Sequence, residues 1–143
     1  MKQILFIFIS VIIFSLCNIS SNEPWEDLFD GKTLNGWNVK NGNAHYAVEN
    51  GAVVGTAVLI SPNTFLCTDS IYSDFILEYE FILNGELNSG VQIRSNSYPE
   101  FQDGRVHGYQ VEIDPSERRW TGGIYDEARR PGYIQLILTT NKR

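Results

Sequence analysis

Three short segments of this chain alternate apolar and polar residues, and only an extended strand sorts such a pattern onto two faces. In residues 108–114, GYQVEID, the apolar side chains fall on odd positions and the polar ones on even positions. Residues 90–94, GVQIR, repeat the pattern, and residues 75–83, FILEYEFIL, are its strongest example. The alternation predicts strands that pack one face on a core and turn a polar face away from it.

Turn-forming dipeptides separate the apolar segments. Asn50-Gly51 lies between residues 44–49 and 52–60, which predicts a β-hairpin. Residues 121–125 offer another short strand, and no segment keeps the 3.6-residue period of a long helix. Many short strands at regular spacing predict an all-β fold, an antiparallel β-sandwich or jelly roll.

The N-terminus has the pattern of a secretory signal. In residues 1–20, Lys2 precedes an almost wholly apolar stretch that is too short to favour a membrane span. We expect an exported chain, periplasmic or extracellular, without a transmembrane helix after cleavage. A lipid anchor at Cys17 is the alternative, although Leu16 before that cysteine fits it poorly. Residues 21–27 then form a linker, and residues 28–143 form one domain.

Charge and cysteine content exclude several classes of function. The net charge is −6 at pH 7 and no basic stripe is present, so nucleic acid is not an expected partner. Cys17 and Cys67 are the two cysteines, and loss of the signal would leave Cys67 without a disulfide partner. The apolar surroundings of Cys67 predict a buried, inert thiol. The two cysteines and two histidines lack the spacing of a zinc site.

Polar residues of the three alternating segments form a candidate sugar-binding face. If the strands are neighbours, one face collects seven side chains: Glu78, Glu80, Gln92, Arg94, Gln110, Glu112 and Asp114. Amides and carboxylates suit sugar hydroxyls, and Trp37 or Trp120 would supply a flat platform for a sugar ring. A solvated face on which Arg94 neutralises its neighbours is the alternative, and periodicity does not choose between the two.

Two further patterns bear on catalysis. Glu112-x-Asp114-x-x-Glu117 has the spacing of the signature of glycoside hydrolase family 16, whose retaining mechanism needs two carboxyl groups about 5 Å apart. Pro115 interrupts the strand and Glu117 has the wrong parity unless a bulge intervenes, so we do not favour that chemistry. Of the two histidines, His107 borders the polar strand and is the better candidate proton carrier than His45.

Four segments in order resemble the 3-keto-disaccharide hydrolase family, also described as 3-keto-glucoside 1,2-lyase and 3-keto-2-hydroxy-glucal hydratase. They are LFDGKTLNGW at 28–37, NSGVQIR at 88–94, HGYQVEID at 107–114 and GGIYDEARR at 122–130. The likeness covers nearly all of residues 25–130. It implies a concanavalin A-like jelly roll, exported, that acts on oxidised carbohydrates.

The resemblance also implies a chemistry. A ketone at sugar C3 acidifies the C2 proton, a base removes it, and the C1 substituent leaves before water adds. Such a site needs a base, a stabiliser for the enolate and a proton donor for the leaving oxygen. We take Glu112 or Asp114 as the base and Arg94 as the stabiliser. A divalent cation is an alternative to Arg94, with the two carboxylates as its ligands.

The remaining roles on this face stay as alternatives. Gln92 or Gln110 would assist Arg94, and His107 or Tyr125 would donate the proton to the leaving group. Further substrate contacts are expected from Glu80 and Trp120. A non-catalytic carbohydrate-binding module on the same scaffold is the competing function, because jelly rolls host both classes.

The C-terminal residues depart from the pattern of the family. Members resembling this subtype continue after DEARR with Gly-Trp-x-Tyr-Pro, whereas residues 131–143 read PGYIQLILTTNKR. Codons TAT ATC CAG TTG ATC TTA would encode residues 133–138, and the same bases read two nucleotides in give Tyr-Pro-Val-Asp-Leu. We therefore expect a frameshift near residue 130 and an incomplete jelly roll. Exposed sheet edges would follow, which makes an inactive fragment a further alternative.

Overall fold

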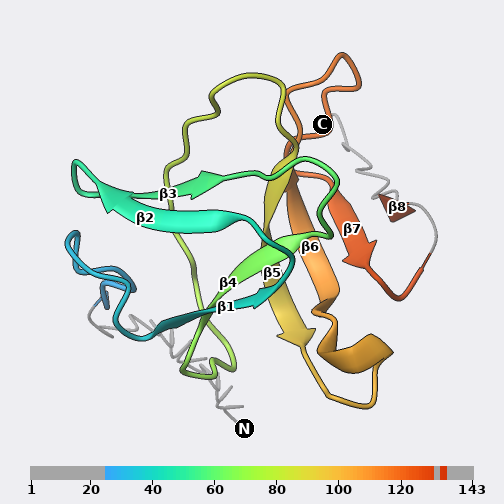
Figure 1. Ribbon diagram of the computed structural model, residues 1–143, viewed down its shortest axis with the longest axis horizontal. Coiled ribbons are helices and arrows are strands. Elements are labelled where there is room, and N and C mark those ends of the chain that lie inside the picture. Colours follow the sequence, from blue (N-terminus) through green and yellow to red (C-terminus); the bar gives the residue numbers. More distant parts are fainter. Residues whose placement is uncertain (1–24, 131–132, 135–143) are drawn as a thin grey trace, which may run out of the picture.

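The computed structural model describes residues 25–130 and 133–134, and its regular structure there is antiparallel β-sheet with one short 3-10 helix, η1 (Gln102–Gly104) (Figure 1). The expected all-β class is confirmed. Within the described residues, no helix is long and apolar enough to cross a membrane. The expected signal segment, residues 1–20, and nearly all of residues 131–143 lie outside the described residues.

The strands form three antiparallel sheets. One pairs β1 (Trp37–Asn41) with β4 (Thr64–Thr68), and another pairs β2 (His45–Glu49) with β3 (Ala52–Thr56). The third sheet contains, in spatial order, β5 (Ser89–Asn96), β6 (His107–Ile113), β7 (Ile124–Glu127) and β8 (Tyr133–Ile134). Figure 1 shows the two small sheets towards the left and centre of the view and the four-stranded sheet towards the right, and this set of antiparallel sheets is consistent with a β-sandwich.

The predicted hairpin at Asn50-Gly51 is confirmed. Asn50 has φ of 50° and Gly51 has φ of 79°, as a two-residue turn with the right twist requires. The hairpin lies between β1 and β4 in the sequence, and the Tyr46 hydroxyl donates to the Thr64 carbonyl oxygen at 3.0 Å. That bond joins the two small sheets. β3 ends at Thr56, earlier than the expected range 52–60.

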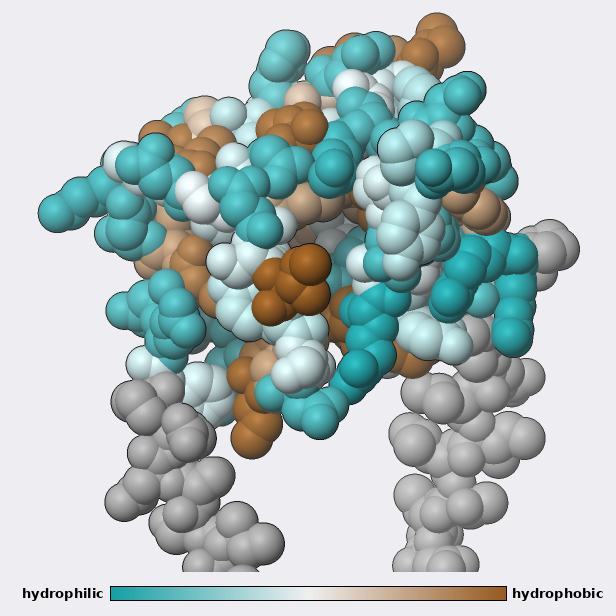
Figure 2. Space-filling view, turned by 90° about the horizontal axis from the view of Figure 1, so that it is seen from below, coloured by the Kyte–Doolittle hydropathy of each residue, from teal (hydrophilic) through white to brown (hydrophobic). Residues whose placement is uncertain are grey.

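The strand predicted over residues 75–83 is wrong. The segment carries no strand in the structure, and Ile76 is 77% exposed and Ile82 96% exposed. A strand needs a partner for its backbone N–H and C=O groups, and none of the described residues pairs with this segment. Alternation provided two faces, but it carried no information about a partner. Figure 2 shows, on the face seen from below, hydrophobic side chains reaching the surface between hydrophilic ones.

The buried interior of the described residues is mostly polar. Its buried apolar side chains are Val106 and Ile113. The buried polar or charged residues are more numerous: His107, Gln110, Glu112, Asp114, Asp126 and Glu127. All but one of these six lie on β6 or β7, and Asp114 directly follows β6. A buried charge is costly without a partner, so the partners of these residues indicate which of them have a structural role and which are candidates for a functional site.

Candidate functional site

One face of the four-stranded sheet collects polar side chains from three strands. In the antiparallel register Gln92 lies opposite Gln110, and Gln110 lies opposite Tyr125. Residues directly opposite each other share a face, so Glu112 and Glu127 belong to the same face by alternation along β6 and β7. The condition set on the alternating segments, that they are neighbouring strands, therefore holds for 90–94 and 108–114.

The even-numbered polar side chains of β6 are buried and do not face solvent. Gln110 is 9% exposed and Glu112 is 3% exposed, whereas Tyr109 and Val111 on the other parity are half-buried. The expectation of a polar face directed away from the core is therefore corrected. A solvated sheet face does not describe these residues.

A chain of side-chain hydrogen bonds, which we call the amide chain, crosses from β5 to β6 and ends on Glu112. The Ser95 hydroxyl donates to Gln92 Oε1 at 2.6 Å, and Gln92 Nε2 donates to Gln110 Oε1 at 2.9 Å. Gln110 Nε2 then donates to Glu112 Oε1 at 3.1 Å. From the loop before β5, Asn88 Nδ2 donates to Glu112 Oε2 at 2.9 Å. The hydrogen bonds thus lead to a single carboxylate, that of Glu112, and each bond in such a chain is strengthened because its neighbours polarise it.

Gly90 provides the space that the amide chain needs. It lies opposite Glu112 in the register of β5 and β6. A Cβ atom at this position would stand 2.5 Å from Gln110 Cγ and 2.8 Å from Gln110 Nε2. Only glycine therefore lets the Gln110 side chain lie across β5 to reach its two partners.

Arg94 does not join this face, contrary to the expected grouping. The register of β5 and β6 shifts between Ile93 and Asn96, so two residues of β5 oppose Gly108 alone. This bulge gives Arg94 a φ of 48° and places Ser95 on the polar face in its stead. The Arg94 side chain is 61% exposed and its Nη2 lies 2.9 Å from Asp74 Oδ1. Because of the bulge, the regular alternation of side chains between the two sheet faces does not continue past residue 93.

Glu112 differs from the other buried carboxylates in its partners. Asp114 pairs with Arg118, Asp126 with two arginines, and Glu127 with Arg105. Among the described residues no arginine, lysine or histidine forms an ion pair with Glu112, whose bonds come from neutral amides. Three of these carboxylates therefore have the counter-charge that burial calls for, and the fourth does not.

Asp114 is engaged in the turn that follows β6. Its Oδ1 accepts from the Ser116 backbone N–H at 3.1 Å, and its Oδ2 accepts from Arg118 Nε at 2.7 Å. Hydrogen bonding from the Ser116 side chain, followed by the Arg118 guanidinium, lowers the pKa of Asp114. Glu117 is exposed on the same turn. The turn uses both oxygens of Asp114, so Glu112 and Glu127 are the carboxylates left on the sheet face, and Glu127 is paired with Arg105.

The other predicted site residues are spread over different surroundings. His107 is buried against Phe101, with ring centroids 4.0 Å apart, and its Nδ1 lies 2.8 Å from the Arg105 carbonyl oxygen. Trp120 is half-buried, with the Arg118 guanidinium over its ring. Glu80 is exposed on the segment that forms no strand. Tyr125 is half-buried on the face of the amide chain. The structure therefore unites Gln92, Gln110, Glu112 and Tyr125.

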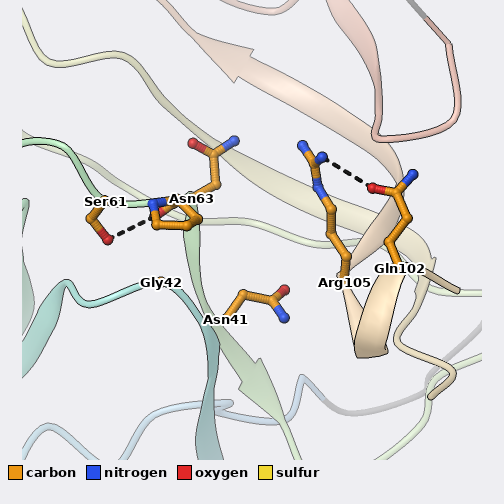
Figure 3. A pocket seen from close by; sticks show the side chains of 7 residues that line it. Asn41, Gly42, Ser61, Asn63, Gln102 and Arg105 are labelled. Carbon is orange, nitrogen blue, oxygen red and sulfur yellow. Dashed lines mark hydrogen bonds between the residues drawn. The ribbon is translucent and has the colours of Figure 1, made fainter.

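A polar hollow of about 560 Å³ opens where the loop before β6 meets the small sheets (Figure 3). Its lining residues are Asn41, Gly42, Ser61, Pro62, Asn63, Gln102 and Arg105. Two of the lining residues bind Glu127, whose Oε1 accepts from Arg105 Nη2 at 2.7 Å and whose Oε2 accepts from Asn63 Nδ2 at 3.2 Å. Glu127 therefore ties the four-stranded sheet to the segment before β4.

Sequence reasoning missed four residues of this region. Glu127 was detectable, because it shares the parity of Tyr125 within one short strand. Ser95 required knowledge of the bulge, and Arg105 and Asn88 lie on loops that have no periodicity. For the cation considered as an alternative to Arg94, the described residues contain no group of three histidine, cysteine, aspartate or glutamate side chains placed to hold a metal.

Comparison with models of known protein families gives a match over most of the chain. Residues 24–142 match the family model described as the 3-keto-alpha-glucoside-1,2-lyase-like domain. The matched range contains every strand of the structure and the whole amide chain. A search of curated proteins found no match.

Proposed function

The chain belongs to the family of 3-keto-alpha-glucoside-1,2-lyase-like domains, and on that premise we propose that it cleaves 3-keto-glycosides by elimination. The ketone at C3 acidifies the C2 proton, which a carboxylate removes to leave an enolate. The enolate then breaks the bond between C1 and the glycosidic oxygen, and that oxygen takes up a proton. Water adds to the resulting keto-glucal, so the glycosidic bond is cut without an oxocarbenium ion.

Glu112 is the base in this proposal, and one observation carries the assignment. It is a buried carboxylate, 3% exposed, that receives hydrogen bonds from neutral amides alone among the described residues. A carboxylate with a structural role would be expected to carry an arginine, as Asp114 and Glu127 do. A buried charge without that compensation is typical of a functional group.

Neighbours of Glu112 take the remaining roles. The Gln92 and Gln110 amides each carry a second N–H, which would donate to the enolate oxygen in place of Arg94. Tyr125 lies opposite Gln110 on the same face, and its hydroxyl would protonate the leaving oxygen. His107 is less suited to this step because it packs between Phe101 and the Arg105 carbonyl oxygen.

Substrate would reach Glu112 from the side of Asn88. Asn88 is exposed, lies on the loop before β5 and bonds one carboxylate oxygen. A substrate that displaced this amide would bring its C2 proton to Glu112 Oε2 while Gln110 kept hold of Oε1. The amide chain would thus hold the base in position during the reaction.

The test is cleavage of a 3-keto-glucoside with a chromogenic leaving group by the full chain. Glu112→Gln keeps the size of the side chain and removes the base, so turnover should fall by roughly 10²-fold or more. Asp114→Asn is the matched control and should retain activity within a few-fold, with circular dichroism confirming the fold of both variants. Unchanged turnover in Glu112→Gln would refute the assignment. Binding of sugars without turnover by the unmodified chain would favour the carbohydrate-binding module.

We also propose that the chain is exported, on the basis of the signal pattern in residues 1–20. The N-terminal sequence of the mature protein tests this, and it should begin between Cys17 and Asn22. A mature chain that retains Met1 and stays in the cytoplasm would refute export. The frameshift near residue 130 stays a prediction for the nucleotide sequence of the gene.

A further inference from the structure

The polar hollow is separate from Glu112 along the four-stranded sheet. Glu127, which binds two residues that line the hollow, is opposite Gly108, while Glu112 is opposite Gly90. Positions 108 and 112 are roughly 13 Å apart along an extended strand. The proposed base is therefore not among the residues that line the hollow, and the hollow needs its own explanation.

The charge inside the hollow is balanced. Arg105 is the charged residue among those lining it, and Glu127, 2% exposed, neutralises the guanidinium at 2.7 Å. The chain as a whole carries a net charge of −6, so no excess of positive charge attracts an anion. A balanced pair of this kind favours an uncharged ligand over a phosphate or carboxylate.

The polar groups that point to the hollow offer both donors and acceptors. Gln102 uses its Oε1 to accept from Arg105 Nη1 at 3.2 Å, which leaves its amide N–H groups for a ligand. Asn63 uses its Nδ2 on Glu127, which leaves its Oδ1 as an acceptor. Figure 3 shows Asn63 on one side of the opening and Arg105 with Gln102 on the other. Hydroxyl groups donate and accept at once, so they match this lining.

The lining is held in place by contacts that join separate parts of the fold. Asn41 Oδ1 accepts from the Val106 backbone N–H at 2.8 Å, and Asn41 Nδ2 donates to the Gly104 carbonyl oxygen at 3.2 Å. These bonds fix the loop that carries Gln102 and Arg105 to the end of β1. The open hollow, about 560 Å³ in volume, is of the size of small-molecule sites.

We propose that this hollow is a binding site for an uncharged, hydroxyl-rich molecule of sugar size. Gln102 and Arg105 donate hydrogen bonds to its hydroxyl oxygens, and Asn63 accepts from a hydroxyl group. Pro62 provides a small apolar wall. Binding here needs no ketone and no base, so the site does not depend on cleavage at Glu112.

The experiment titrates the ¹⁵N-labelled full chain with methyl α-glucoside and with trehalose, which contain no ketone and cannot undergo the elimination. We expect the Arg105 Nε–H resonance to shift, with a Kd of about 1 mM or tighter. Gln102→Ala removes one hydrogen bond and should weaken binding about fivefold. Arg105→Lys keeps a positive charge near Glu127 but loses the planar fork, and should weaken binding at least as much.

Asn84→Ala is the matched control, because Asn84 is an exposed amide far from the lining in sequence and should leave binding unchanged. Glucose 6-phosphate tests the charge argument and should bind more weakly than methyl α-glucoside. Absence of binding, equal binding by Gln102→Ala and Arg105→Lys, or preference for the phosphate would each overturn the proposal. Binding that Gln102→Ala weakens in a chain that cleaves no keto-glucoside would support the hollow and refute only the catalytic assignment.

Discussion

Replacement of Gly90 by alanine should break the amide chain at its centre. The new Cβ would stand 2.5 to 2.8 Å from three atoms of the Gln110 side chain, which must then move away. Gln110 would lose its bonds to Gln92 and to Glu112. A bond between neutral groups contributes about 0.5–1.5 kcal/mol and one to a charged group about 1.5–3 kcal/mol, so the free energy of unfolding should fall by about 2–4.5 kcal/mol.

Urea denaturation followed by circular dichroism measures this change. With a slope of about 2 kcal/mol per molar, the midpoint of Gly90→Ala should fall by about 1–2 M. The structural reason is tested by the same substitution in a Gln110→Ala background, where the clashing atoms are absent. There Gly90→Ala should cost nothing, or should stabilise by about 0.5–1 kcal/mol because alanine suits a strand better than glycine does.

The double-mutant cycle distinguishes this explanation from a general intolerance of alanine at position 90. The interaction free energy should equal most of the cost of the single Gly90→Ala change. If the two substitutions are additive within about 0.5 kcal/mol, the clash with Gln110 is not the cause and the reasoning about the amide chain fails.

Three further predictions follow from single contacts. Glu127→Gln removes the charged partner of the half-exposed Arg105 and should lower the free energy of unfolding by about 1–3 kcal/mol. Thermal denaturation measures this loss, and an unchanged stability would mean that the ion pair is not formed. The pKa of Asp114 is lowered in the folded state, so its ionised form stabilises the fold fully above the unfolded pKa of about 3.9. This stabilisation is lost as the pH falls through the folded pKa, so Asp114→Asn should lose less stability than the unmodified chain below about pH 4. An identical pH profile of stability in the two chains would contradict this. Burial raises the pKa of Cys67, so iodoacetamide should alkylate the native thiol much more slowly than the denatured one, and equal rates would show that Cys67 is accessible.

The alternation of residues 90–94 and 108–114 was enough to predict two strands and to put Gln92, Gln110 and Glu112 on one face if those strands were neighbours, which they are. Period two fixes which side chains share a face, and Asn50-Gly51 fixes a hairpin through its backbone conformation. These features depend on residues close together in sequence. No strand was predicted over β1 or β4, since WNVKN alternates over four residues only and TFLCT holds three consecutive apolar residues.

The failures have causes that a local pattern does not contain. Residues 75–83 alternate well but find no pairing partner among the described residues. Arg94 was assigned to the polar face by counting, and the bulge after Ile93 turns it to Asp74 instead. Arg105 lies on a loop, where nothing in the sequence indicates that it reaches Glu127. Partner choice and loop geometry are decided by tertiary structure.

The most direct measurement is deuterium incorporation at C2 when the full chain cleaves a 3-keto-glucoside in D₂O. Elimination removes the C2 proton and hydration returns one from solvent, so the 3-keto-glucose product should carry deuterium at C2, beyond the exchange seen without protein. Glu112→Gln should abolish this protein-dependent incorporation, and Asp114→Asn should retain it. Product that keeps its original C2 proton, or equal incorporation with Glu112→Gln, would contradict the role of the buried carboxylate at the end of the amide chain.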